Sequence, residues 1–96
     1  MTKETIKKLS NIIEKRSREL PSGSYVTKLI KEGKVKIANK LGEEAVETIT
    51  AFLAQEKSEI IEESADLIFH LLVLLKTSDL SFEDVLKVLD ERMKND

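Results

Sequence analysis

The segment from about residue 58 to residue 77 constrains the fold more than any other part of this chain. Drawn as a helix, it is apolar almost all the way round, through Leu67, Ile68, Phe69, Leu71, Leu72, Val73, Leu74 and Leu75. Such a helix is normally buried on all sides, and a chain of 96 residues has little else with which to cover it. Two copies packed together cover it readily. The segment therefore predicts a helical protein that is at least a dimer.

Helical periodicity extends through the rest of the chain. Apolar residues recur every three or four positions from about residue 3 to 19, from 34 to 55 and from 82 to 94. A break at residues 20–24 precedes a short helix that ends near Gly33. No internal repeat or long linker divides the chain. We therefore expect one all-α domain, residues 1–96, folded as a four- to five-helix bundle completed by dimerisation.

Local signals mark where these helices begin. Ser24 is expected to cap the short helix, and Ser58 the fourth. Ser81 and Asp84 form a variant of the capping box at the start of the fifth.

The third helix has an expected apolar face, which runs through Ala38, Leu41, Ala45, Ile49 and Phe52. Gly42 lies inside this helix and costs up to about 1 kcal/mol relative to alanine. That cost predicts a close helix contact or the approach of another group to the backbone.

Composition excludes several classes of protein. The chain has no cysteine and one histidine, which excludes disulfide scaffolds, cysteine nucleophiles, thiolate metal sites and polyhistidine sites. Its net charge of −2 is unlike that of a polybasic nucleic-acid binder. No apolar signal segment follows the N-terminus, and the apolar stretch at 67–75 is far shorter than the roughly 20 residues of a membrane span. We expect a cytoplasmic protein with no nucleic-acid or membrane partner.

Two pairs of acidic residues carry the strongest chemical signal. Glu44 and Glu47 lie three residues apart on the third helix, and Glu63 and Asp66 repeat that spacing on the fourth. A short turn favours antiparallel packing of the two helices, so the four carboxylates are expected to converge. Hard divalent cations such as Mg²⁺ take oxygen ligands of this kind. The competing interpretation is ordinary solvated surface charge, which is common on helices. Glu63 and Asp66 interrupt a helix that otherwise looks buried, which supports the metal site, and both interpretations stay open at this point.

Several neighbouring residues have both a structural and a functional interpretation. His70 follows Asp66 by one turn, either as a hydrogen-bonded core residue or as a partner of the Asp66 carboxylate. Lys36 and Lys40 share a flank with Glu44 and are either solvated or directed at phosphate. Tyr25 is a core aromatic residue or a substrate contact.

Three strings of sequence resemble a known family. They are Pro21-Ser22-Gly23-Ser24-Tyr25, Lys40-Leu41-Gly42-Glu43-Glu44-Ala45-Val46-Glu47, and Glu63-Ser64-Ala65-Asp66 continuing to Val73. Together they resemble the phosphoribosyl-ATP pyrophosphatases, from about residue 6 to residue 92. The E-x-x-E and E-x-x-D pairs alone are shared with the wider group of MazG-like, all-α nucleotide pyrophosphohydrolases.

The resemblance implies an all-α homodimer that hydrolyses phosphoribosyl-ATP to phosphoribosyl-AMP and pyrophosphate with Mg²⁺, the second step of histidine biosynthesis. It implies that the metal ligands are Glu44, Glu47, Glu63 and Asp66. We expect Glu43 or Glu47 to orient the attacking water as general base. Substrate is expected to contact Lys36, Lys40, Ser24 and Tyr25.

Two other functions remain open from the sequence. A housekeeping pyrophosphohydrolase for other nucleoside triphosphates would carry the same acids with a different base pocket. A non-enzymatic helical dimerisation module would carry them as ordinary surface charge. A ferritin-like di-iron site fits poorly, because such sites use E-x-x-H and the residue three before His70 is Leu67.

Overall fold

The computed structural model describes residues 4–54 and 56–95, and these form five α-helices. They are α1 (Thr5–Glu19), α2 (Tyr25–Glu32), α3 (Lys34–Ala54), α4 (Lys57–Thr77) and α5 (Phe82–Asn95). The all-α prediction is confirmed. The expected first residue of the first helix and last residue of the third, positions 3 and 55, lie outside the described residues.

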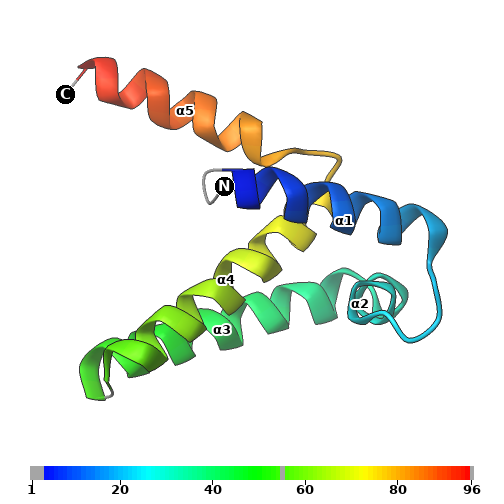
Figure 1. The fold of residues 1–96 in the computed structure, drawn as a ribbon, viewed down its shortest axis with the longest axis horizontal. Coiled ribbons are helices and arrows are strands. Elements are labelled where there is room, and N and C mark those ends of the chain that lie inside the picture. The colour runs from blue at the N-terminus through cyan, green and yellow to red at the C-terminus, as the bar shows by residue number, and fades with distance from the viewer. Residues whose placement is uncertain (1–3, 55, 96) are drawn as a thin grey trace.

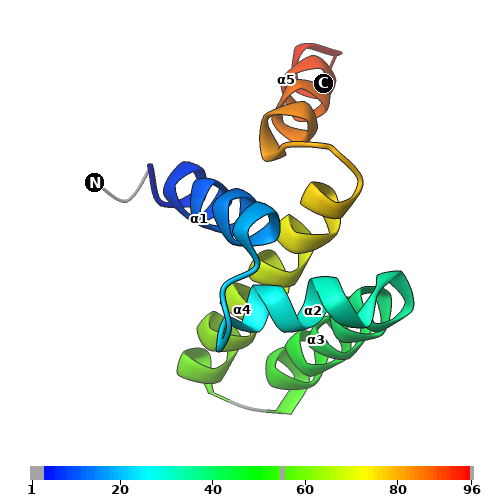
Figure 2. The ribbon, with the colours of Figure 1, turned by 90° about the vertical axis from the view of Figure 1, so that its right-hand side faces the viewer.

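Helices α3 and α4 form a long hairpin that is the centre of the fold (Figure 1). The two helices lie side by side in both views, and α2 packs against α3 while α1 crosses the C-terminal half of α4 (Figure 2). The fully buried core lies where α1, α2, α3 and α4 meet, and it consists of Ile13, Val26, Leu29, Ile37, Leu72 and Val73. This arrangement places the facing sides of α3 and α4 next to the core.

The predicted helix ends are partly confirmed. Ser24 caps α2, since its Oγ accepts a hydrogen bond from the Thr27 amide at 3.3 Å. Gly33 ends that helix at a φ of +95°, a conformation that favours glycine. The Ser81 amide donates to Asp84 Oδ2 at 2.9 Å, which is the reciprocal half of a capping box. The prediction for Ser58 was wrong, because α4 begins at Lys57 and the N-cap position is occupied by Glu56, two residues before Ser58.

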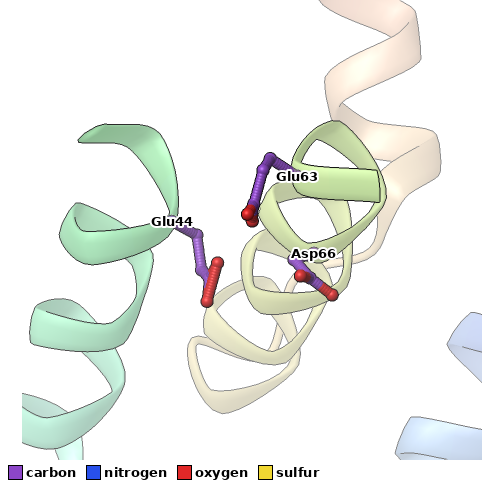
Figure 3. Close-up of side chains that lie close together, drawn as sticks. All are labelled: Glu44, Glu63 and Asp66. Atoms are coloured by element: carbon purple, nitrogen blue, oxygen red, sulfur yellow. The ribbon is translucent and has the colours of Figure 1, made fainter. Parts of the chain in front are cut away.

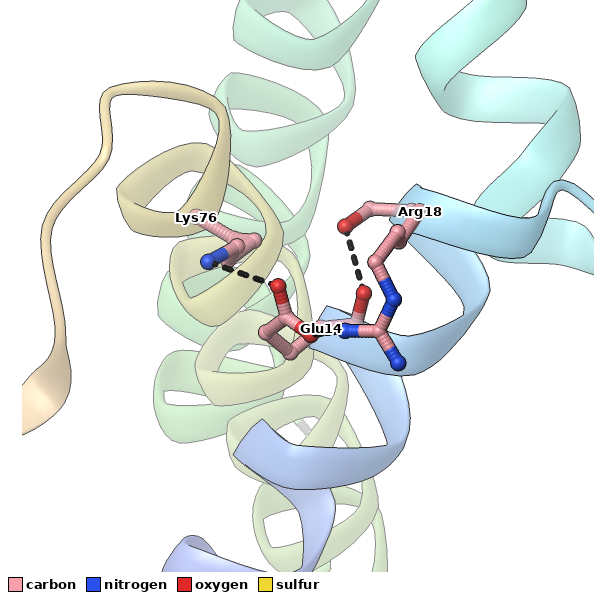
Figure 4. A network of polar contacts seen from close by, with 4 residues as sticks. Glu14, Arg18 and Lys76 are labelled. Atoms are coloured by element: carbon pink, nitrogen blue, oxygen red, sulfur yellow. Dashed lines mark hydrogen bonds and ion pairs between the residues drawn. The ribbon is translucent and has the colours of Figure 1, made fainter.

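Helix α1 is fixed to α4 by a charged contact as well as by the core. Glu14 pairs with Arg18 on its own helix, and its other carboxylate oxygen lies 3.2 Å from Lys76 Nζ on α4 (Figure 4). The Lys76 hydrogen bond is the main reason that the pKa of Glu14 lies below its ordinary value, with further lowering by the charge of Arg18. This glutamate is therefore fully paired within the chain.

The predicted apolar face of α3 was wrong in its direction. The side that faces the rest of the chain runs through Ile37, Leu41, Glu44, Thr48 and Ala51. Of the residues expected to be buried, Ala38, Ile49 and Phe52 are exposed, Phe52 by 71%. The next residue, Leu53, is 74% exposed. Within this chain α3 packs against α4 and α2, and these helices cover the side that runs from Ile37 through Glu44 to Ala51.

The expectation for Gly42 is also not met within this chain. Gly42 is exposed, and a Cβ atom built on it would meet no heavy atom within 4 Å. Helix α4 likewise leaves Ile61 and Ile68 exposed, although it was expected to be buried all round. None of the residues 82–95 of α5 is fully buried. The radius of gyration is 14.6 Å, above the roughly 12 Å expected for a compact chain of this length.

No helix among residues 4–54 and 56–95 has the length and apolar character needed to cross a lipid bilayer.

Candidate active site

Three of the four predicted carboxylates meet between α3 and α4. Glu44 projects from the middle of α3 toward Glu63 and Asp66, which lie on adjacent turns of α4 (Figure 3). One carboxylate oxygen from each lies within 4.8 Å of the others. We call these three residues the carboxylate group. Their convergence follows from the antiparallel hairpin, because each acidic residue lies on the side of its helix that faces the other helix.

Glu44 is the most deeply placed member. It is 7% exposed, and its Oε2 atom is buried without a hydrogen-bond partner among residues 4–54 and 56–95. Burial is the main reason that its pKa lies above the ordinary value, and the negative charges of Glu47 and Asp66 raise it further. A buried carboxylate oxygen without a partner is costly. The described part of the chain therefore supplies no positively charged or hydrogen-bonding neighbour for this oxygen.

Glu63 has the same kind of environment. Its pKa is also raised, first by loss of solvent and then by the charges of Glu47 and Glu44. Glu47 itself is exposed and lies outside the carboxylate group. Its charge nevertheless acts on both Glu44 and Glu63. Glu47 therefore borders the group from its solvent side.

A hard divalent cation fits these residues. All the donors are carboxylate oxygens, and they come from two facing helices. Mg²⁺ is commonly held by a few carboxylates together with waters and substrate phosphates. The unpartnered Glu44 Oε2 is an oxygen that such an ion would satisfy. Mutual repulsion and burial, which raise the pKa values of Glu44 and Glu63, are both relieved by a bound cation.

His70 is held by two hydrogen bonds within the chain. Its Nδ1 lies 2.7 Å from the Asp66 carbonyl oxygen, which can only accept, so Nδ1 carries the proton and donates. Its Nε2 lies 2.9 Å from the hydroxyl of Tyr25, which therefore donates to Nε2 in the neutral ring. His70 thus contacts the backbone of Asp66 and not its carboxylate. The structure places it as a buried, hydrogen-bonded residue of the core.

Tyr25 links α2 to α4, the helix that carries Glu63 and Asp66. Its ring stacks against Phe69 with centroids 5.9 Å apart and meets His70 edge-on at 5.7 Å. Burial is the main reason that its pKa is raised. The charges of Lys40 and Glu44 also act on Tyr25, the first lowering and the second raising its pKa. Tyr25 therefore packs against α4 beside His70, which engages its hydroxyl, and the charge of Glu44 reaches it.

The other predicted site residues surround the group at different depths. Lys40 is partly buried and lies 3.8 Å from Glu43 Oε2, one turn along the same helix. Lys36 and Glu43 are exposed. Ser24 holds the start of α2 as its cap. Of the two lysines, Lys40 is the one whose charge reaches Glu44, where it lowers the pKa.

Comparison with known proteins decides the family. Residues 6–93 match the phosphoribosyl-ATP pyrophosphohydrolase family. The chain belongs to this family. A phosphoribosyl-ATP pyrophosphatase of Metallosphaera sedula is 46% identical over 91 residues, which is 95% of this chain and 98% of that protein. One from Saccharolobus islandicus is 43% identical over 94 residues, 98% of this chain and all of that protein.

A longer relative also matches this chain. The histidine biosynthesis bifunctional protein HisIE of Thermotoga maritima is 45% identical over 86 residues, or 90% of this chain. This chain spans 44% of its length. The matched region of the phosphoribosyl-ATP pyrophosphohydrolase family includes all three members of the carboxylate group.

One residue at the site was missed from the sequence. Thr48 bonds to the backbone carbonyls of both Glu44 and Glu63. Its position four residues after Glu44 places it on the same side of α3, which is a signal that the helical spacing contains. Threonine is common on helices, so residue type alone did not mark it.

Proposed function

We propose that this chain hydrolyses phosphoribosyl-ATP to phosphoribosyl-AMP and pyrophosphate in the presence of Mg²⁺, the second step of histidine biosynthesis. The family membership supports the reaction. The observation that carries the chemistry is the buried, unpartnered Glu44 Oε2 beside two further carboxylates. The cytoplasmic location expected from the sequence stays a prediction.

Glu44, Glu63 and Asp66 would hold the metal, with Glu47 completing the set from the solvent side. When bound, Mg²⁺ supplies charge neutralisation on the departing pyrophosphate and a lowered pKa for an attacking water. Four ionised carboxylates carry −4, and one Mg²⁺ leaves the site negative. Two or more ions, with Lys36 and Lys40, would reverse that sign and admit a triphosphate.

Glu47 is our choice for the general base. Glu43 lies 3.8 Å from Lys40, which offsets its charge. Glu47 has no ion pair among the described residues, and its charge reaches both Glu44 and Glu63. A carboxylate at the solvent side of the group is suitably placed to orient a water and accept its proton. Lys40 and Lys36 would contact phosphate oxygens. Tyr25 and Ser24 would border the substrate at the start of α2.

We further propose that two copies of the chain form a homodimer. The accessible surface is 7201 Å², whereas a compact monomer of 10.9 kDa should expose about 5,600 Å². A standard interface buries about 800 Å² per partner, so the excess is large enough for one. Apolar side chains on the outer side of the α3–α4 hairpin are exposed, namely Val46, Ile49, Phe52, Leu53, Ile61 and Ile68.

Sedimentation of the Phe52→Lys variant tests the dimer. Wild type should sediment as a dimer at micromolar concentration, and Phe52→Lys should shift to a monomer because a lysine would be buried without a partner. Ile12→Lys changes an exposed residue of α1, outside the two helices of the hairpin, and should remain dimeric as the control. A wild-type chain that sediments as a folded monomer would contradict the proposal.

Pyrophosphate release tests the reaction. The wild-type chain should release pyrophosphate from phosphoribosyl-ATP with Mg²⁺ and not in EDTA, and much faster than from ATP or dATP. Equal rates on all three nucleotides would favour a housekeeping pyrophosphohydrolase. No release from any of them would favour a dimerisation module. Glu47→Gln should lower kcat by more than about a hundredfold, because the missing charge acts in the transition state.

A further inference from the structure

One threonine connects the backbones of the two helices that carry the carboxylate group. Thr48 on α3 lies with its Oγ1 2.8 Å from the Glu44 carbonyl oxygen and 3.2 Å from the Glu63 carbonyl oxygen on α4. Its single proton is shared between two acceptors. Within residues 4–54 and 56–95, this is the one side-chain hydrogen bond that joins α3 to α4.

The first of these bonds is ordinary, and the second is not. Helical threonines often donate to the carbonyl four residues earlier, as Thr77 does to Val73 at the end of α4. In the part of the chain that the structure describes, Thr77 has no second acceptor on another helix. Thr48 reaches across the hairpin to the backbone of the residue whose side chain faces Glu44.

The electrostatics give this bond a role. Glu44, Glu63 and Asp66 carry like charges within 4.8 Å of one another, so without a cation they push α3 and α4 apart. The Thr48 bond opposes that movement at the two residues concerned. Mg²⁺ requires ligand oxygens at about 2.0–2.1 Å in near-ideal geometry, whereas Ca²⁺ accepts about 2.3–2.6 Å in flexible geometry. A fixed separation of the helices therefore matters more for the smaller ion.

We infer that Thr48 is a positioning residue that fixes the separation of α3 and α4 at the carboxylate group, and thereby sets affinity and selectivity for Mg²⁺ over larger cations. It acts through the backbones of Glu44 and Glu63, to whose carbonyl oxygens its hydroxyl bonds. This inference rests on the metal site of the proposed function. It adds a residue that neither the acidic spacing nor the family match indicates.

Calorimetric titration of the substrate-free chain with MgCl₂ and with CaCl₂ tests it. Thr48→Val keeps the shape and removes the hydroxyl, and should raise the Kd for Mg²⁺ about tenfold or more, as loss of an outer hydrogen bond to a metal ligand commonly does. The Kd for Ca²⁺ should rise less than half as much. Thr48→Ser keeps the hydroxyl and should bind both ions within about twofold of wild type.

Two further variants keep the test decisive. Thr77→Val removes the same kind of bond from α4 without a cross-helix acceptor and should leave both Kd values unchanged. If Thr48→Val does not fold, Thr48→Ala against Thr48→Ser isolates the hydroxyl in the same way.

Distinct results would overturn the inference alone or together with the proposed metal site. A lower melting temperature for Thr48→Val with unchanged Kd values would mean that the bond only stabilises the fold. An equal rise in the Kd values of Thr48→Val for Mg²⁺ and Ca²⁺ would refute the role of Thr48 in selecting Mg²⁺. A wild-type chain that binds no Mg²⁺, yet releases pyrophosphate in EDTA, would remove the metal site and the role of Thr48 with it.

Discussion

Glu14 and Glu44 both lie against α4, yet their surroundings are opposite. Glu14 pairs with Lys76 and Arg18, and its pKa is lowered (Figure 4). Glu44 faces Glu63 across the hairpin, one of its oxygens has no partner, and its pKa is raised (Figure 3). The first contact is complete within the chain and holds α1 in place. In the proposed function, a bound cation would supply the missing partner of the second contact.

The largest expected difference between the two is in catalysis. Glu44→Gln keeps the shape of the side chain and removes a metal-binding charge, so kcat for pyrophosphate release should fall by more than about a hundredfold. Glu14→Gln should leave kcat within about twofold, because Glu14 pairs with Lys76, ten residues along α4 from Asp66, and holds helices together. Steady-state kinetics on phosphoribosyl-ATP checks both variants. Comparable losses of kcat in the two variants would contradict the assignment of Glu44 to the active site and of Glu14 to helix packing.

The next difference concerns stability with and without metal. A ligand that binds only the folded state at a hundred times its Kd stabilises it by about 2.7 kcal/mol, or roughly 10–20 °C in Tm for a chain of this size. Mg²⁺ should therefore raise the Tm of wild type and of Glu14→Gln, but not that of Glu44→Gln or Asp66→Asn. In EDTA, Glu44→Gln should melt above wild type because repulsion is relieved.

Thermal melts in EDTA and in excess MgCl₂ measure these shifts. Identical melting of wild type and Asp66→Asn, with no response of either to Mg²⁺, would rule out the metal site.

The pH dependence of the metal-free chain should show two opposite slopes. The folded-state pKa values of Glu44 and Glu63 lie above 4.5, so the folded state takes up protons first and stability should rise as pH falls from 7 toward 4.5. The pKa of Glu14 lies below 4.5, so its contribution is present above that pH and is lost as pH falls further.

Melting in EDTA between pH 7 and pH 3.5 separates these contributions. Glu44→Gln should flatten the upper part of the profile, and Glu14→Gln should flatten the lower part. A wild-type Tm that falls steadily from pH 7 to pH 5 would contradict the raised pKa values of Glu44 and Glu63.

The smallest expected effect concerns Lys40, the lysine whose charge reaches Glu44. Lys40→Ala should raise KM about tenfold and leave kcat nearly unchanged, because its ammonium would meet phosphate oxygens already present in the ground state. Lys34→Ala, at the exposed start of α3, is the control and should change neither constant. A large loss in kcat for Lys40→Ala would assign Lys40 to the transition state instead.

Much of the fold could be predicted because its signals are local. Helical periodicity located all five helices, and Ser24 and Gly33 bounded α2 as expected. The equal spacing of Glu44 and Glu47 and of Glu63 and Asp66, on consecutive helices, indicated where carboxylates would gather. Each of these features depends on residues a few positions apart, whose geometry the helix itself imposes.

The sequence by itself thus determined the helices and the angular order of side chains around each one. Only the tertiary structure decided how α3 is rotated against α4, which buries Glu44, leaves Phe52 exposed and keeps Glu47 at the rim. It also decided that Thr48 reaches the Glu63 carbonyl. The physical reason is that periodicity fixes angles relative to the helix axis, whereas the absolute rotation depends on which side finds a neighbour, and that is a property of the packed chain.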